Sequence, residues 1–116
     1  EVDGKVAVVI DDMVDTAGTL TSGINMLYEK GAKEVIAACA HGVLSGPAIE
    51  RLKNSGLSEF IVTNTIDQTE NAKLYDEMVV LSVAPLAAAA IEAVELNESL
   101  SYALQTALVH EDDNRH

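Results

Sequence analysis

The chain has 116 residues, of which 48% are hydrophobic and 22% are charged, and its net charge is −12. This length is sufficient for one compact domain, and the hydrophobic fraction indicates a globular chain rather than a disordered one. The acidic charge argues against nucleic-acid binding through a basic surface. Because no apolar run reaches the roughly 20 residues that cross a bilayer, we expect neither nucleic acid nor a membrane as a partner.

Two features of the chain concern its cellular setting. The single cysteine, Cys39, lies in an apolar run and has no partner for an internal disulfide. The first residues also lack a basic segment followed by an apolar stretch, so we expect no secretory signal and a cytoplasmic location. The first residue is Glu1 rather than methionine, which suggests a processed or excised part of a longer protein.

Apolar runs and helical patterns alternate along the chain. The apolar runs predict strands at residues 5–10, 34–40, 59–64 and 78–83. The helical spacing predicts helices at residues 19–30, 46–55 and 85–96. The strand runs are continuous rather than alternating, which is typical of strands that are buried on both faces of a parallel sheet. Residues 67–76 have no clear periodicity and are expected to form a polar connector.

This alternation predicts an α/β fold. Right-handed crossovers between parallel strands favour a doubly wound, mainly parallel sheet of about four strands with flanking helices. From Ser99 onward the apolar residues again have helical spacing, but the last six residues are polar and are expected to fray.

One segment has a pattern typical of ligand binding, Asp11-Asp12-Met13-Val14-Asp15-Thr16-Ala17-Gly18-Thr19. It follows an apolar strand, and open α/β folds bind ligands where such strands end. Ala17 and Gly18 are small enough for the backbone amides to surround an anion. Thr16 and Thr19 add hydroxyl donors, and the positive end of the following helix dipole points to the same place. The pattern predicts a phosphate-binding loop without a lysine.

The paired acids at the start of this segment have a different predicted role. Asp11 and Asp12 can accept hydrogen bonds from two adjacent sugar hydroxyls or hold a hydrated Mg²⁺. The alternative interpretation is structural, since an Asp followed by Thr and Gly is also typical of a plain helix cap and turn. The combination of strand, acids, loop and helix favours the binding site.

Other polar residues favour structural roles. We interpret His41 as a hydrogen-bonded residue at a strand end rather than a ligand. Ser45-Gly46-Pro47 is interpreted as a helix cap rather than an anion site. Cys39 is expected to be an inert core residue. No His and Cys residues have the spacing of a zinc site.

The segment VVIDDMVDTAGTL, residues 8–20, resembles the loop shared by phosphoribosyltransferases and ribose-phosphate pyrophosphokinases, the synthetases of phosphoribosyl pyrophosphate (PRPP). Further segments resemble the pyrophosphokinase family in particular: HGVLSGPAIERL (41–52), VTNTI (62–66), LSVAPL (81–86) and NESLSY (97–102). The resemblance implies that residues 1–102 are the C-terminal part of that family's second phosphoribosyltransferase-type α/β domain. Residues 103–116 would then be a polar tail that is helical before it frays.

The family resemblance also implies an activity, the transfer of a diphosphoryl group from ATP to ribose 5-phosphate with Mg²⁺. This is a kinase-type transferase reaction of nucleotide biosynthesis. The implied 5-phosphate site is formed by Asp15, Thr16, Ala17, Gly18 and Thr19. The implied partners of the ribose 2- and 3-hydroxyls are Asp11 and Asp12, which would approach the metal only through water or substrate. The implied site for a regulatory phosphate or ADP includes Ser99 and Ser101.

The chain also departs from the family pattern. The ATP site and the mobile loop with a catalytic lysine and arginine have no counterpart in these residues, so we assign no catalytic residue. We expect the chain to be inactive by itself and no Lys or Arg to lie near the phosphate loop. Alternatives are a phosphoribosyltransferase, a non-catalytic PRPP-synthetase-like subunit and an excised fragment. Since an incomplete sheet exposes apolar surface, we also expect a homo-oligomer.

Overall fold

The computed structural model describes residues 1–113. Residues 114–116, the end of the tail expected to fray, lie outside the described residues. The chain divides into two compact units, one of residues 1–81 and one that begins at Ser82. Within the part of the chain that the structure describes, no helix is both long and apolar enough to cross a membrane.

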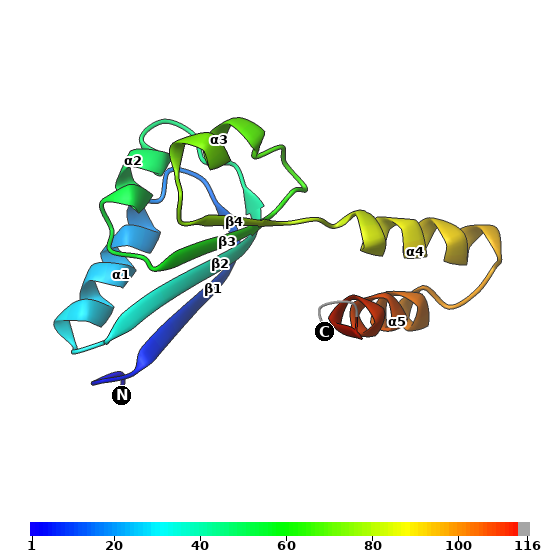
Figure 1. Ribbon diagram of the computed structural model, residues 1–116, viewed down its shortest axis with the longest axis horizontal. Coiled ribbons are helices and arrows are strands. Elements are labelled where there is room, and N and C mark those ends of the chain that lie inside the picture. The colour runs from blue at the N-terminus through cyan, green and yellow to red at the C-terminus, as the bar shows by residue number, and fades with distance from the viewer. Residues whose placement is uncertain (114–116) are drawn as a thin grey trace. The chain divides into compact units, whose positions relative to one another are not determined.

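The first unit contains a four-stranded parallel sheet (Figure 1). The strands are β1 (Val6–Val14), β2 (Glu34–Gly42), β3 (Glu59–Thr63) and β4 (Met78–Leu81), and they lie side by side in this order. All neighbouring pairs are parallel, with Val8 opposite Ile36 and Phe60 opposite Met78. The predicted α/β class and the parallel sheet of four strands are therefore confirmed.

Three helices connect these strands: α1 (Gly18–Glu29), α2 (Ala48–Lys53) and α3 (Thr69–Leu74). Helix α3 was not expected, because it is a six-residue helix within the predicted connector and contains no buried residue. Its start is ordered locally, since Thr69 donates its backbone N–H and its hydroxyl to Asp67 at 3.0 and 2.6 Å. These bonds to the carboxylate also lower the pKa of Asp67. Neither interaction produces the apolar periodicity by which a helix is predicted.

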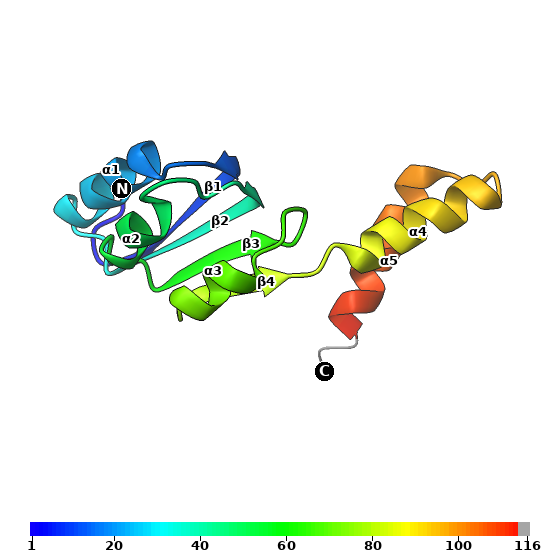
Figure 2. The ribbon, with the colours of Figure 1, turned by 90° about the horizontal axis from the view of Figure 1, so that it is seen from above.

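The winding differs from the doubly wound arrangement that the alternation predicts. A doubly wound sheet needs a reversal of strand order, whereas the described strands follow one another in sequence order. Because crossovers between parallel strands are right-handed, consecutive crossovers in one direction place their helices on the same face. Figures 1 and 2 show α1, α2 and α3 on one side of the sheet.

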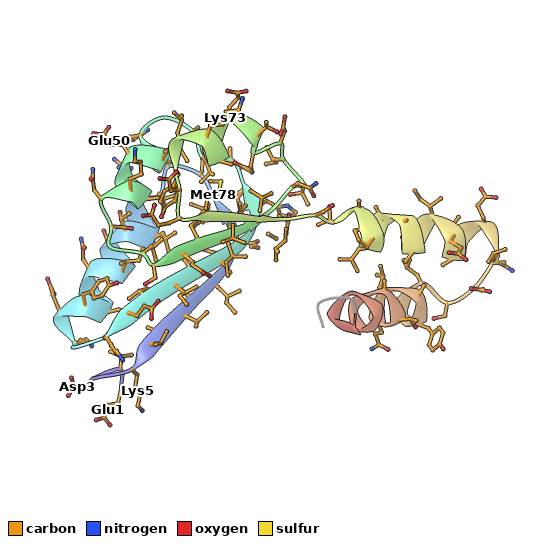
Figure 3. The ribbon with its side chains drawn as sticks, viewed as in Figure 1. Glu1, Asp3, Lys5, Glu50, Lys73 and Met78 are labelled. Atoms are coloured by element: carbon orange, nitrogen blue, oxygen red, sulfur yellow. The ribbon has the colours of Figure 1, made fainter. Side chains whose placement is uncertain are left out.

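The two faces of the sheet consequently differ in burial. On the helix-covered face the core contains Val35, Ala37, Cys39, Phe60, Val62 and Met78 from the strands and Ile24 and Leu52 from the helices. The opposite face has exposed apolar side chains at Val6, Val8, Ile10, Val79 and Leu81. Strand burial on both faces was predicted, but the side chain of Ile10 is 79% exposed. Figure 3 shows side chains that project from this face of the sheet, with no segment of the first unit over them.

The second unit consists of helices α4 (Ala84–Glu95) and α5 (Leu100–Asp113), which contact each other. Between them Asn97 adopts a left-handed conformation with φ 55°, and Glu98 N donates to Ala93 O at 2.8 Å. This is a common way to end a helix. Helix α5 continues through residue 102, and the division into a domain of residues 1–102 and a tail of residues 103–116 stays a prediction.

Candidate functional site

The first strand is longer than its sequence predicts. Strand β1 continues to Val14, because Asp11, Met13 and Val14 all pair with residues of β2. Asp11, Asp12 and Met13 therefore belong to the strand, and the loop that joins it to α1 contains only residues 15–17. The apolar run predicts a strand that ends at Ile10, with the paired acids after it. Pairing with β2 keeps the next residues extended, so the strand continues to Val14.

A hollow of about 320 Å³ lies at the carboxyl end of β1. It is lined by Asp11, Met13, Val14, Asp15, Thr16, Ala17, Gly18, Thr19 and Leu20. The structure thus brings together all the residues predicted for the sugar-phosphate site except Asp12. Consecutive residues of a strand face opposite sides of the sheet, and Asp12 accordingly shares its side with Ile10.

The start of α1 has the features of an anion site. Ala17 precedes the helix in a left-handed conformation with φ 66°, which L-residues other than Asn and Asp rarely adopt. Among the described residues, no side chain caps this helix end, and the first turn contains no acidic residue. The first N–H groups of a helix have no partner within it. The plain-cap alternative is therefore not supported, and backbone donors are available where the helix dipole is positive.

The loop is held by the segment between β2 and α2. Val43 N and Leu44 N both donate to Val14 O, at 3.0 and 3.2 Å. The hydroxyl of Ser45 donates to Asp15 Oδ1. The interpretation of Ser45-Gly46-Pro47 as a helix cap is therefore wrong for the Ser45 side chain. Helix α2 has no side-chain cap hydrogen bond at its own N-terminus.

Arg51 is the residue near the loop that sequence reasoning missed. Its Nη1 donates to Thr16 O at 3.1 Å, and the same atom would lie 3.2 Å from a Cβ at Gly18. The expectation that no Lys or Arg lies near the loop is therefore wrong. The two residues are 35 positions apart, so no local pattern connects them.

The polar groups around the hollow have identifiable environments. Asp11 is exposed and accepts a hydrogen bond from Asp12 N at 2.8 Å. It lies opposite Cys39, and the pKa of that thiol is raised to about 11 by burial and, secondarily, by the charge of Asp11. His41 Nδ1 lies 2.8 Å from Thr65 Oγ1, as expected for a hydrogen-bonded histidine.

The described residues contain no group of three His, Cys, Asp or Glu side chains placed to hold a metal ion. Asp11 and Asp12, the predicted ligands, each carry one carboxylate, and Mg²⁺ is commonly bound by one or two carboxylates with water and substrate oxygens. The assignment of Mg²⁺ and of these ligands stays a prediction.

The serines predicted for a regulatory site lie in the second unit. Ser99 Oγ accepts a hydrogen bond from Tyr102 N at 3.3 Å, so its hydroxyl contacts the first turn of α5. Ser101 is exposed. Their predicted role toward phosphate or ADP remains a prediction.

The fold and the site together define a class of protein. It is the class of parallel α/β proteins with a candidate anion site between the carboxyl end of a strand and the start of the next helix. The family model described as "Phosphoribosyl synthetase-associated domain" matches residues 1–105, and the chain belongs to this family.

Its relatives include ribose-phosphate pyrophosphokinases. The chain is 56% identical to the one from Halalkalibacterium halodurans over 100 residues, which are 86% of this chain and 31% of that protein. It is 54% identical to the one from Bacillus caldolyticus over 101 residues, 87% of this chain and 32% of that protein. A solved structure, the phosphoribosylpyrophosphate synthetase from Mycobacterium smegmatis, matches with a TM-score of 0.79 and 51% identity over 83% of this chain and 32% of its own. The chain thus spans about a third of the length of these relatives.

Proposed function

We propose that this chain supplies the ribose 5-phosphate site of a ribose-phosphate diphosphokinase. The observation that carries the proposal is the uncapped start of α1, which forms one wall of the hollow with Asp11 at its edge. The names of the relatives support it, since they are kinase-type transferases that act on ribose phosphate. The matched third would be the C-terminal part of the second phosphoribosyltransferase-type domain of such an enzyme.

In this proposal the 5-phosphate binds at residues 15–19. The backbone N–H groups at the start of α1 and the hydroxyls of Thr16 and Thr19 donate to its oxygens. These donors counter the repulsion that a net charge of −12 exerts on an anion.

The sugar hydroxyls are proposed to bind the acids of β1. Asp11 lines the hollow and accepts a hydrogen bond from one ribose hydroxyl in this proposal. Asp12 does not line the hollow, and its contact with the second hydroxyl stays a prediction. Mg²⁺, held by Asp11 together with water and substrate oxygens, would supply neutralisation of phosphate charge.

This chain contributes binding rather than a complete active site. We assign no catalytic residue to it, and ATP is proposed as a substrate of an intact enzyme, bound by residues outside those described here. Since phosphoryl transfer depends on positioning and charge neutralisation, the chain by itself is proposed to make no PRPP.

Titration calorimetry with ribose 5-phosphate tests the proposed site. Replacing Thr19→Val removes a hydroxyl donor to a charged oxygen, so we expect the affinity to fall about tenfold or more. The matched control is Thr106→Val in α5, in the second unit, where the Thr106 hydroxyl donates to Tyr102 O. Binding that is equal for ribose and ribose 5-phosphate, or that is unchanged in Thr19→Val, would contradict the proposal.

A further inference from the structure

Residues 43–51, the segment between β2 and α2 together with the first residues of α2, contact three consecutive residues, Val14 at the end of β1 and Asp15 and Thr16 in the loop that follows. Residues 43 and 44 donate to the carbonyl of Val14, the Ser45 hydroxyl donates to the carboxylate of Asp15, and Arg51 donates to the carbonyl of Thr16. None of the residues 43–51 lines the hollow itself. Their contacts are therefore with the loop rather than with whatever occupies the hollow.

These contacts determine where the loop amides point. No described peptide bond is cis, and in a trans peptide the C=O and the following N–H point in opposite directions. Arg51 holds the C=O of Thr16, and it thereby also sets the direction of the Ala17 N–H. The two bonds to the Val14 C=O set the direction of the Asp15 N–H in the same way.

The loop needs such support because its backbone is strained. Ala17 has φ 66° in the loop and Leu44 has φ 51° in the contacting segment, and both side chains are buried. A non-glycine residue in this region is less stable than in the right-handed conformation, because its Cβ approaches the following carbonyl oxygen. Such a conformation persists only where the surrounding contacts over-determine it.

The charges of the contacting groups also suit an anion. The Ser45 hydroxyl occupies one oxygen of Asp15, the acid closest to the start of α1 along the chain. Arg51 places a guanidinium beside the loop, and among the described residues its contact with Thr16 is the one hydrogen bond between a basic side chain and residues 11–19. A charge-assisted bond of this kind is stronger than a neutral one.

We propose that residues 43–51 form a brace that presets the β1–α1 loop for an anion, with Arg51 and Ser45 as positioning residues. The inference rests on the proposed function for the identity of the anion, the phosphate of ribose 5-phosphate. The brace acts through the directions of the loop amides and not through contact with the sugar phosphate.

The first experiment measures amide hydrogen exchange in the chain without ligand. In Arg51→Met the hydrogen-bonded amides at the loop, those of Thr21, Val43 and Leu44, which donate to Ala17 O and Val14 O, are expected to exchange about tenfold faster, which is the loss of one charge-assisted hydrogen bond. Ser45→Ala is expected to act in the same direction and more weakly. The amides of Phe60 and Val62 in β3 serve as internal controls and should not change. Lys53→Met is the matched control, since Lys53 is an exposed cation of the same helix. An equal increase at the loop and at β3, or no increase at the loop, would overturn the brace.

The second experiment measures affinity for ribose 5-phosphate, inorganic phosphate and ribose. Arg51→Met should weaken the binding of the two phosphate ligands about tenfold, with Arg51→Lys recovering part of the loss and Lys53→Met having no effect. If the unaltered chain binds no ribose 5-phosphate, the proposed function fails, and the exchange experiment still decides whether the brace orders the loop. If it binds ribose 5-phosphate and the Arg51 variants bind equally well, the brace is overturned and the proposed function stands.

Discussion

The two faces of the sheet have the same kind of strand residues and opposite surroundings. The helix-covered face buries Phe60 and Val62 completely, whereas the open face leaves Val8 and Ile10 exposed. The continuous apolar runs predict burial on both faces, but only the helices decide which face is covered within this unit. An apolar strand therefore indicates that its side chains are more stable when buried, but it does not indicate which segment or partner covers each face. Three predictions test this difference between the faces.

The largest expected effect is in the centre of the covered face. Phe60 is fully buried, and its ring stacks on that of Tyr75 with a centroid distance of 6.3 Å. Phe60→Ala should lower the free energy of unfolding by about 3–5 kcal/mol, because it removes apolar contacts and leaves a cavity. Urea unfolding followed by circular dichroism measures the change. A loss below that of an exposed-site variant such as Ile10→Ala would contradict the difference in burial.

A smaller effect is expected where the covered face has no room for a side chain. A Cβ at Gly42 would lie 2.9 Å from Val62 Cγ2 and 3.0 Å from Gln68 Nε2, which donates to Gly42 O at 2.6 Å. Gly42→Ala should therefore cost about 1–3 kcal/mol through overpacking. Gly23→Ala is the control, because a Cβ there meets nothing within 4 Å and the site lies inside α1. That variant should gain about 0.5–1 kcal/mol from helix propensity. Equal effects of the two substitutions in urea unfolding would show that the packing argument is wrong.

The smallest effect on stability is expected on the open face. Ile10→Thr should change the free energy of unfolding by no more than about 0.5 kcal/mol, because the Ile10 side chain already contacts solvent. The same change should reduce self-association in sedimentation velocity, since exposed apolar surface favours an assembly that covers it. The predicted homo-oligomer depends on this face. An unaltered chain that sediments as a monomer at high concentration would contradict that prediction.

Local patterns were sufficient for much of the fold. The positions of the four strands, of α1, α2 and α4, and of the loop before α1 follow from apolar runs, helical spacing and small residues. Helix α3 was missed because it has only six residues, none of them buried, and therefore no apolar periodicity. The Asp67–Thr69 hydrogen bond at its start is not visible in such a pattern. The extension of β1 to Val14 was missed because pairing with β2, and not the composition of residues 11–13, keeps them extended.

The candidate site divides in the same way. Local sequence signals predicted the α/β class and the candidate phosphate segment from Asp15 to Thr19, because the strand, the loop and the start of the helix are contiguous in the chain. Only the tertiary structure placed Arg51 and Ser45 against that loop, separated Asp11 from Asp12, and put all three helices of the first unit on one face. These features depend on contacts between residues that are far apart in the chain and on the direction of the crossovers. A local pattern predicts neither these contacts nor the direction of the crossovers, because it depends only on residues that are close together in the chain.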